Sequence, residues 1–521
     1  MDSKELRSHK IVLKPTNVEL TAPAGTPLRD LLFEQGVEFP CGGHGRCRGC
    51  RVRVLQGNVE VNDAQRRLLK PLELAEGWRL ACQGILNDDL VIELRQWDAA
   101  ILANDTTFAF TPRPGLGVAV DLGTTTLVAQ LLDLQTSHVL AVRTALNGQA
   151  RYGADVMSRV GFSVAEKGQK KLEDIIRTQI GKLINDLVFA AQVNPTDIEE
   201  VTIVGNTVMY HLFCGIDLEP MSHYPFEPRQ DGMMTFLASD LGWSISSSAI
   251  VRFLPCLGSF VGSDITAGVL ATGIHESKDL VGLVDLGTNG EIVIGNRDGM
   301  LCSSTAAGPA FEGARISMGM RAATGAISEV YLNGGSVHCR VLGNTDPLGI
   351  CGSGLVDAVA VGLDLGVVLP SGRLTSTERL AGGEKAWSLC PPIALSQTDI
   401  RELQLAKGAI AAGIHLILQQ WGASEKDLTH LYLAGAFGNY ISRSSAQRIG
   451  LLKFPLDTVQ PAGNTALLGA KLGLFINDES IYQTIRSKTK HVSLNEDPSF
   501  QEAFVDEMSF PQEALEVEAV E

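Results

Sequence analysis

The chain has 521 residues, of which 45% are hydrophobic, and this content is enough to bury the cores of about three domains. Acidic residues outnumber basic residues by 59 to 43, and the formal net charge of -16 argues against nucleic acid or an anionic membrane as the main partner. The ten cysteines do not suggest a disulfide framework, and no apolar leader or membrane-length apolar run is present, so we expect a soluble protein of the cytoplasm.

The first 97 residues are predicted to form a small domain built mostly from strands. Residues 9–13 (HKIVL) and 17–20 (NVEL) are β-prone and predict a hairpin. Residues 51–55 (RVRVL) and 90–94 (LVIEL) predict two further strands. This order of elements resembles the β-grasp ferredoxin fold.

A cysteine-rich loop lies between these strands. Residues 41–50 read CGGHGRCRGC, with the spacing C-x5-C-x2-C, and a fourth cysteine follows at position 82. Close-spaced thiolates can surround an iron–sulfur cluster, and the glycines let backbone N–H groups approach the sulfurs. The first gap is one residue longer than in plant-type ferredoxins, which resembles the adrenodoxin-like variant. We therefore predict a [2Fe–2S] cluster, with these ligands: Cys41, Cys47, Cys50 and Cys82.

Two aspects of this loop have alternative interpretations. A zinc knuckle is the alternative to the cluster, although zinc sites usually pair two CxxC units and only one is present. Arg46, Arg48, Arg51 and Arg53 either form a solvated face, or raise the potential of the cluster and dock an acidic partner.

Residues 98–116 have little hydrophobic periodicity and contain the sequence Thr-Pro-Arg-Pro-Gly. Such a composition is typical of a linker that is stiffened by proline. We therefore place a domain boundary here and begin the next domain at residue 117.

Two similar hairpins mark the main body of the chain. Residues 117–133 (GVAVDLGTTTLVAQLLD) contain an apolar strand, a DLGTTT turn and a second strand, and residues 281–296 (VGLVDLGTNGEIVIGN) are a near copy. An aspartate at a strand end can hold hydrated Mg²⁺, and the N–H groups and hydroxyls of the following turn can face phosphate oxygens. One DxGT turn is compatible with an ordinary hairpin, but two such turns predict a duplicated architecture.

A third glycine-rich turn follows a predicted long helix at residues 399–421. Residues 430–440 (HLYLAGAFGNY) form an apolar strand and a turn that resembles the adenosine motif of the actin, sugar-kinase and heat-shock ATPase superfamily. The two DxGT hairpins resemble the phosphate motifs of that superfamily. Ala436 stands where many members have a second glycine, so the details of the adenine contact differ from the usual pattern.

The superfamily resemblance implies the residues of an ATP site. Asp121 and Asp285 match the catalytic aspartates, and the nucleotide-contacting positions are these: Gly123, Thr124, Thr125, Gly287, Thr288, Asn289, Gly435 and Gly438. Glu312, in the sequence GPAFEGA, is a candidate for positioning magnesium or water. Asp264 either orients water or metal, or stabilises the start of its own helix.

The main body and the C-terminal end of the chain carry two further features. Asn206 follows the apolar sequence VTIVG and is either part of a cleft wall or a plain helix cap. After residue 478 the sequence becomes polar and ends in FPQEALEVEAVE, so residues 479–521 are expected to form a C-terminal extension with an acidic, mobile tail. The actin-like ATPase domain is therefore expected at 117–478.

The predicted fold class is α/β multidomain, with an N-terminal β-grasp [2Fe–2S] ferredoxin domain and an actin-like (ribonuclease H-like) duplicated ATPase domain. This combination, and the phrases DLGTTT, VGNTVM, DLGTNGEI, GPAFEGA, CGSG and LAGAFG, resemble the reductive activators of corrinoid-dependent methyltransferase systems. The short linker between the two domains resembles the shorter form of that family.

The resemblance implies an ATP-dependent transfer of one electron from the [2Fe–2S] cluster to a cobalt(II) corrinoid, which restores cobalt(I). The implied cofactors are the cluster, ATP and Mg²⁺. The implied partners are a corrinoid protein and a separate reduced electron-donor protein, because no nicotinamide or flavin fingerprint is present in the sequence. The resemblance also suggests a homodimer.

Three other functions are compatible with the sequence. The protein is alternatively a plain ferredoxin carrier whose large domain is a scaffold, a metabolite kinase with a redox-sensing cluster, or an ATP-driven electron injector for a non-corrinoid enzyme. No residue stands out as a phosphoryl-acceptor base, and the dedicated ferredoxin domain differs from the interface cluster of the dehydratase activators.

Overall fold

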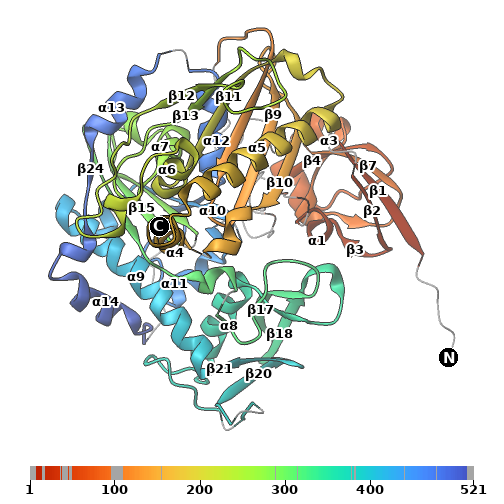
Figure 1. The fold of residues 1–521 in the computed structure, drawn as a ribbon. Helices are drawn as coiled ribbons and strands as arrows, with labels where there is room; N and C mark the ends of the chain where they lie inside the picture. Colours follow the sequence, from red (N-terminus) through yellow and green to blue (C-terminus); the bar gives the residue numbers. More distant parts are fainter. Residues whose placement is uncertain are drawn as a thin grey trace.

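A computed structural model describes the following residues: 7–14, 18–33, 35, 37, 45, 50–94, 110–153, 155–287, 289–313, 315–376, 378–380, 383–438, 440–476 and 478–512. A small N-terminal domain lies at one side of a larger α/β body (Figure 1). The α/β multidomain class that was predicted from the sequence is confirmed.

The N-terminal domain is built on a five-stranded sheet of order β2-β1-β7-β4-β5. Its strands are β1 (Ser8–Lys14), β2 (Val18–Pro23), β4 (Arg51–Gln56), β5 (Trp78–Leu80) and β7 (Leu90–Leu94), and the shorter elements are β3 (Thr26–Pro27), β6 (Ile85–Leu86), α1 (Leu28–Phe33), α2 (Asp63–Leu68) and α3 (Pro71–Ala75). β1 and β2 form the predicted hairpin, whereas β1 and β7 are parallel. Leu28 and Leu32 of α1 join the core that the sheet buries, which is the β-grasp arrangement.

The first half of the larger body contains a six-stranded sheet of order β10-β9-β8-β11-β13-β12. Its strands are β8 (Leu116–Leu122), β9 (Thr126–Asp133), β10 (Val139–Leu146), β11 (Ile198–Gly205), β12 (Met234–Leu237) and β13 (Ile250–Phe253), and its helices are α4 (Val156–Ala165), α5 (Gln169–Ala191) and α6 (Thr207–Cys214). Nearly every residue of β8 and β11 is buried, as expected for strands that are covered on both faces.

The second half repeats this plan in a sheet of order β23-β22-β14-β15-β16-β24. Its strands are β14 (Val281–Leu286), β15 (Gly290–Asn296), β16 (Gly299–Thr305), β22 (His430–Ala434), β23 (Val459–Gly463) and β24 (Thr489–His491). In both sheets an antiparallel meander, β8–β9–β10 or β14–β15–β16, has a parallel strand on its other side, β11 or β22. This repeat confirms the predicted duplication.

Two helices join the sheets. α7 (Ser263–Thr272) and α12 (Thr465–Gly473) pack closely against each other; α12 contacts β8 and β11, and α7 contacts β11 and β14. Their approach needs glycine, because a Cβ atom at Gly469 would lie 2.2 Å from the carbonyl oxygen of Ala267. The two sheets whose strands carry the DxGT turns are therefore connected through this helix pair.

A further lobe is inserted into the second half, at the bottom of Figure 1. It contains β17 (Ala326–Asn333), β18 (Ser336–Val341), β19 (Gly349–Ile350), β20 (Ala386–Cys390), β21 (Ile393–Ser396) and α8 (Gly352–Asp364). β17 and β18 form an antiparallel hairpin. The helix predicted at 399–421 is α9 (Gln397–Trp421), which returns the chain to the second sheet and is followed, after β22, by α10 (Gly435–Gly438) and α11 (Arg443–Arg448).

Residues 479–512, which were expected to extend beyond the ATPase domain, pack into it. They form α13 (Ser480–Lys488), strand β24 at the edge of the second sheet, and α14 (Phe500–Met508), which contacts α9. The Lys407 side chain of α9 is buried and donates a hydrogen bond to the carbonyl oxygen of Ser509 at 3.0 Å. The expected acidic tail lies outside the described residues from position 513 onward.

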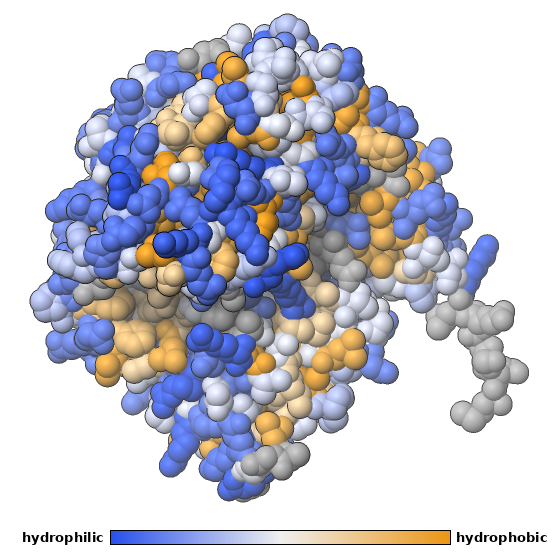
Figure 2. Space-filling model, viewed as in Figure 1, coloured by the Kyte–Doolittle hydropathy of each residue, from blue (hydrophilic) through white to orange (hydrophobic). Residues whose placement is uncertain are grey.

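The expected linker at 98–116 lies outside the described residues up to position 109. From Phe110 the chain packs on the larger body, where the rings of Phe110 and Phe475 are 4.8 Å apart. Arg113 pairs with Glu200 and donates a hydrogen bond to the carbonyl oxygen of Leu474 at 2.8 Å. On the face shown in Figure 2, hydrophilic residues are interspersed with smaller groups of hydrophobic residues.

Candidate functional site

The first DxGT turn is tightly organised. Asp121 lies near the end of β8, and the N–H of Gly123 donates a hydrogen bond to the carbonyl oxygen of Thr126 at 3.1 Å. A Cβ atom at Gly123 would lie 2.5 Å from that oxygen, so the turn requires glycine. Asn206 donates a hydrogen bond to the hydroxyl of Thr124 at 2.8 Å and also caps α6. The helix-cap alternative for Asn206 is therefore confirmed, and its place in a cleft wall stays a prediction.

Arg159 fixes the backbone of this turn, and sequence reasoning did not identify it. Its side chain is fully buried, and its Nη2 atom donates a hydrogen bond to the carbonyl oxygen of Thr124 at 2.6 Å. Its Nε atom bonds the carbonyl oxygen of Gly153 at 2.9 Å. Burial lowers the pKa of Arg159 to about 10, and this cost indicates that the guanidinium is held in place to organise the turn.

The second DxGT turn also follows a strand with an aspartate near its end, but it is closed by a hydrogen bond over a shorter span. Asp285 lies near the end of β14, and the N–H of Gly287 donates a hydrogen bond to the carbonyl oxygen of Asn289 at 3.0 Å. Thr288, a predicted nucleotide contact, lies outside the described residues. Glu291 pairs directly opposite Asp285 across β14 and β15, and sequence reasoning did not identify this buried carboxyl.

Four carboxyl groups between the two turns act electrostatically on one another: those of Asp121, Asp264, Asp285 and Glu291. Burial and the charges of the neighbouring carboxyls raise the pKa of Asp264, Asp285 and Glu291, that of Asp285 to about 7. Burial also raises the pKa of Asp121, to about 6. A hydrogen bond from Asn464 has the opposite effect and lowers this pKa in part. Asp264 therefore faces the two predicted aspartates, and its carboxylate also accepts a hydrogen bond from the N–H of Ile265.

This cluster fits a cation that is bound mostly through water and phosphate. Neighbouring carboxyl groups raise one another's pKa because their negative charges repel. A bound cation would offset this repulsion and stabilise the carboxylate forms. Among the described residues, no group of three or more His, Cys, Asp or Glu side chains has the geometry of a metal site. Mg²⁺ typically keeps several waters and takes only one or two carboxylates, so the arrangement suits Mg²⁺ with a polyphosphate and does not suit a protein-only cage.

The predicted adenosine turn lies beside the second phosphate turn. β22 runs parallel to β14, with Ala434 opposite Asp285, and α10 begins immediately afterwards. Gly435 has a φ of 84°, and a Cβ atom there would lie 2.5 Å from Oδ1 of Asp285. The Asp285 carboxyl is thus accessible to the adenosine turn only because position 435 is glycine.

Glu312 is brought toward this turn through its neighbour. The rings of Phe311 and Phe437 stack with their centroids 4.6 Å apart, which packs the 3₁₀ turn Pro309–Glu312 against α10. The catalytic role of Glu312 stays a prediction. The predicted contacts at Thr125, Asn289 and Gly438 lie on the same three turns, and their nucleotide contacts stay predictions too.

The cluster site is described at two of its four cysteines. Cys50 precedes β4 and is buried, while Cys82 lies in the 3₁₀ turn Ala81–Gln83. The N–H of Ala81 donates a hydrogen bond to the carbonyl oxygen of Cys50 at 3.0 Å, so the two predicted ligands lie on adjoining segments. Cys41 and Cys47 lie outside the described residues.

The surroundings of Cys82 fit a thiolate ligand. The Nε2 atom of Gln83 donates a hydrogen bond to the Cys82 sulfur at 3.7 Å. Gly45 has a φ of 66°, which favours glycine, and a Cβ atom there would lie 2.7 Å from that same nitrogen. N–H donors directed at sulfur stabilise thiolates, as an iron–sulfur cluster requires.

The arginines near the cluster loop are partly engaged within the domain. Arg51 pairs with Glu73 at 2.9 Å and lies over the ring of Trp78, and Arg53 bonds the carbonyl oxygen of Glu76 at 3.0 Å. Arg46 and Arg48 lie outside the described residues. The docking role therefore stays a prediction for the cluster loop.

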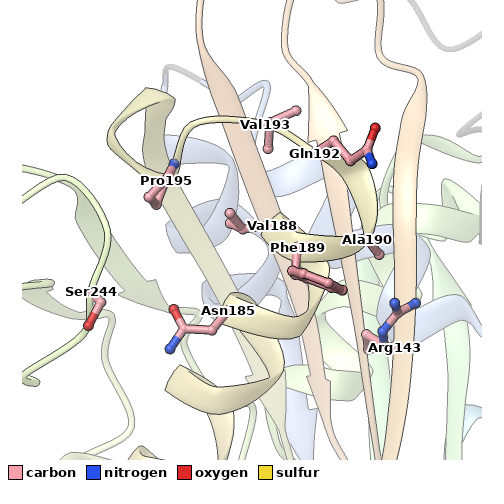
Figure 3. A pocket seen from close by; sticks show the side chains of 9 residues that line it. All are labelled: Arg143, Asn185, Val188, Phe189, Ala190, Gln192, Val193, Pro195 and Ser244. Atoms are coloured by element: carbon pink, nitrogen blue, oxygen red, sulfur yellow. The ribbon is translucent and has the colours of Figure 1, made fainter.

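A separate open groove lies at the end of α5 (Figure 3). Phe189 stands at this groove with its side chain 85% exposed, between Arg143 of β10 and Val193. The groove shares no residue with the three nucleotide turns. Within the described part of the chain, none of the helices is both long enough and apolar enough to span a membrane.

Comparison with known families divides the chain into three matched regions. Residues 11–86 match the family described as a 2Fe-2S iron-sulfur cluster binding domain. Residues 116–277 match the "RACo middle region", and residues 279–521 match the "C-terminal domain of RACo the ASKHA domain".

Individual relatives extend over most of the chain. The chain is 34% identical over 416 residues to a "Corrinoid activation enzyme RamQ" of Eubacterium limosum, covering 75% of this chain and 70% of the relative. It is 27% identical over 392 residues to a "[Co(II) methylated amine-specific corrinoid protein] reductase" of Methanosarcina barkeri, covering 68% and 69%. A solved structure titled "Reductive activator for corrinoid,iron-sulfur protein" superposes with a TM-score of 0.69 at 28% identity and covers 96% of this chain and 98% of the other.

Proposed function

The chain belongs to the family of reductive activators of corrinoid proteins, and we propose that it uses ATP to deliver one electron to the cobalt(II) corrinoid of a methyltransferase corrinoid protein, restoring cobalt(I). The observation that carries the proposal is the union of two sites in one chain. A ferredoxin domain with Cys50 and Cys82 on adjoining segments is joined to a body in which Asp121, Asp264 and Asp285 meet between two phosphate-type turns.

The N-terminal domain would hold the redox group. Cys41, Cys47, Cys50 and Cys82 are proposed as the ligands of a [2Fe–2S] cluster, which when bound supplies a one-electron donor. Gln83 donates a hydrogen bond to the sulfur of Cys82, and Gly45 leaves room for that donor. These residues stabilise the thiolate form of the ligand and keep bulky side chains away from the loop.

The larger body would hold Mg-ATP. We propose that the carboxyls of Asp121 and Asp285 orient the water shell of Mg²⁺, while the turns at 123–125 and 287–289 direct N–H and hydroxyl groups at phosphate. Gly435 lets the turn pack against Asp285, and the backbone of this turn at Gly435 and Gly438 is proposed to contact the adenosine. Glu312 is proposed to position the attacking water.

ATP is needed for an energetic reason. Plant-type [2Fe–2S] centres have potentials near roughly -400 mV, and reduction of a cobalt(II) corrinoid from such a donor is uphill. ATP can supply the difference only if the two nucleotide states favour different conformations of the protein or of its complex. The proposal includes a separate reduced protein as electron donor, a location in the cytoplasm and a homodimer, the last testable by sedimentation.

The direct experiment uses the full chain purified without oxygen and reduced at its cluster. It is mixed with candidate cobalt(II) corrinoid proteins, with and without Mg-ATP, and the cobalt(I) absorbance is followed. We expect cobalt(I) to form with one partner only when hydrolysable ATP is present. Formation that ignores ATP would favour a plain electron carrier, and ADP formation driven by a sugar or acid without any protein partner would favour a metabolite kinase.

A further inference from the structure

The ferredoxin domain contacts the inserted lobe through two ion pairs, formed between α1 and the β17–β18 hairpin. Arg29 and Asp30 are neighbours on α1, and both are buried, with only 5% and 3% of their surfaces exposed. Arg340 of β18 donates a hydrogen bond to Oδ1 of Asp30 at 2.5 Å. Arg29 lies 3.9 Å from Oε2 of Glu329 on β17.

The two partners in the lobe are themselves a matched pair. Glu329 and Arg340 face each other directly across the β17–β18 hairpin. The positive and negative charges that are adjacent on the helix thus each face the opposite charge on the hairpin. Such alternation fixes one orientation of the ferredoxin domain, because a shifted orientation would bring like charges together.

This contact lies next to the predicted cluster. The helix α1, which carries Arg29 and Asp30, packs against the 3₁₀ turn that contains Cys82. At the start of α1 the N–H of Leu28 donates a hydrogen bond to the carbonyl oxygen of Gly84 at 3.0 Å. The charged contact therefore lies on a helix that borders a predicted cluster ligand. The inserted lobe thus contacts the helix that lies beside this segment of the ferredoxin domain.

A second contact connects the ferredoxin domain to the adenosine turn. The hydroxyl of Tyr440 donates a hydrogen bond to the carbonyl oxygen of Val37 at 3.2 Å. Tyr440 comes two positions after α10, whose Gly435 lies against Asp285. One short segment thus contacts the nucleotide turns at its start and the ferredoxin domain at its end.

We propose that Arg29, Asp30, Glu329 and Arg340 form a latch that holds the ferredoxin domain on the lobe in a resting state, and that nucleotide binding at the 435–440 turn releases it through Tyr440. The second part of this inference rests on the proposed function. The released domain exposes its cluster side to the corrinoid partner.

The energetics suit a contact that opens. Removal of water from two ion pairs costs about as much as their attraction returns, so a buried pair stabilises an interface only weakly. The Nε atoms of Arg29 and Arg340 are both buried without a hydrogen-bond partner among the described residues. Release lets these groups regain water, so a small change at Tyr440 is enough to shift the equilibrium.

The test measures hydrogen–deuterium exchange in the cluster-loaded full chain, without any corrinoid protein. Arg340→Glu should speed exchange in residues 28–37 and 336–341 by about fivefold or more, because both sides of the contact are uncovered. Exchanging the charges, with Asp30→Arg and Arg340→Asp in one chain, should restore protection. Arg297→Glu, an exposed arginine on the larger body, is the matched control and should change neither segment.

Nucleotide coupling is tested in the same assay. A non-hydrolysable Mg-ATP analogue should raise exchange in both segments of the wild type but add nothing to Arg340→Glu. Tyr440→Phe removes only the hydroxyl that contacts Val37, so it should blunt the response to nucleotide while the charge contacts remain.

Each outcome decides one part of the proposal. Unchanged exchange in Arg340→Glu, or failure of the exchanged charges to restore protection, overturns the latch. Nucleotide that binds by calorimetry but leaves exchange unaltered overturns the coupling alone. Failure of nucleotide to bind at all overturns the coupling together with the proposed function, while the variants still decide the latch.

Discussion

The Nδ2 atom of Asn464 donates a hydrogen bond to Oδ2 of Asp121 at 2.8 Å, across 343 positions of sequence. The same Asn464 side chain caps α12, where its Oδ1 atom accepts a hydrogen bond from the N–H of Leu467. One residue therefore ties the first phosphate turn to the helix that joins the two sheets. This contact opposes the rise in the pKa of Asp121 that burial causes.

Asn464→Ser separates these two tasks. Serine keeps a capping oxygen but has no N–H donor for Asp121, so the carboxyl loses a partner at a cost of about 1–3 kcal/mol and binds a proton more readily. We expect ATP turnover at pH 7 to fall by about tenfold or more, with a small change in the thermal midpoint. Wild-type turnover in this variant would remove Asn464 from the site.

Asp285→Asn should abolish ATP dependence while the cluster spectrum stays intact. The substitution preserves size but removes a charge from the group of carboxyls that is proposed to orient the Mg²⁺ water shell. The measurement is ATP-driven formation of cobalt(I), together with the visible spectrum of the cluster. Asp298→Asn changes an exposed aspartate and is the control. ATP-driven reduction at the wild-type rate would exclude Asp285 from the site.

Cys82→Ser should prevent stable assembly of the cluster and leave nucleotide binding unchanged. The hydroxyl is a poorer iron ligand than a thiolate, and the hydrogen bond from Gln83 favours charge on sulfur. Iron content and the visible spectrum test the first expectation, and calorimetry with Mg-ATP tests the second. Cys390→Ser, which alters a half-buried cysteine of the inserted lobe, should retain full iron content. A full cluster in Cys82→Ser would identify another fourth ligand.

Asp357→Asn should change how stability depends on pH. Burial raises the pKa of Asp357 from 3.8 to about 7, and the charge of Glu329 adds to this rise. The pKa is lowered in part by a hydrogen bond with Ser445, by the N–H of Val330 and by the charge of Arg29. The folded state thus binds the proton more tightly than the unfolded state does. Its stabilising contribution is full below about pH 4 and is lost as the pH rises through about 7.

The wild type should therefore lose stability between about pH 4 and pH 7 by a few kcal/mol at most, and Asp357→Asn should lose less. Thermal unfolding of the inserted lobe, followed by fluorescence, measures the difference. Asp364→Asn alters an exposed carboxyl at the end of the same helix and serves as the control. Parallel pH profiles for the wild type and Asp357→Asn would contradict the assignment.

The sequence predicted the features that depend on a short contiguous stretch of residues. Apolar strands with a DxGT turn between them identified both hairpins, and the length of the apolar helical pattern located α9 within two residues. Arg159, Asn464 and Glu291 were missed, because their contacts depend on how distant segments pack. The same holds for Arg340, whose partner Asp30 is 310 positions away and follows no motif. Residues 479–512 look polar and separable in sequence, yet β24 completes the second sheet.

Arg159→Lys tests whether the forked guanidinium organises the phosphate turn. Two nitrogens of Arg159 bond the carbonyl oxygens of Thr124 and Gly153, and one ammonium group cannot satisfy both positions. The backbone around Thr124 should loosen. Because that turn is proposed to contact phosphate both before and during hydrolysis, the KM for ATP should rise by about tenfold while kcat changes little.

The control is Arg151→Lys, at an exposed arginine eight positions earlier, which should leave both constants unchanged. Exchange of the Thr124–Thr126 amides supplies an independent measurement, because those amides should lose protection only in Arg159→Lys. A fall in kcat at constant KM would mean that Arg159 acts on the chemical step and not on phosphate binding. Unchanged constants with a lower thermal midpoint would reduce its role to stability of the fold.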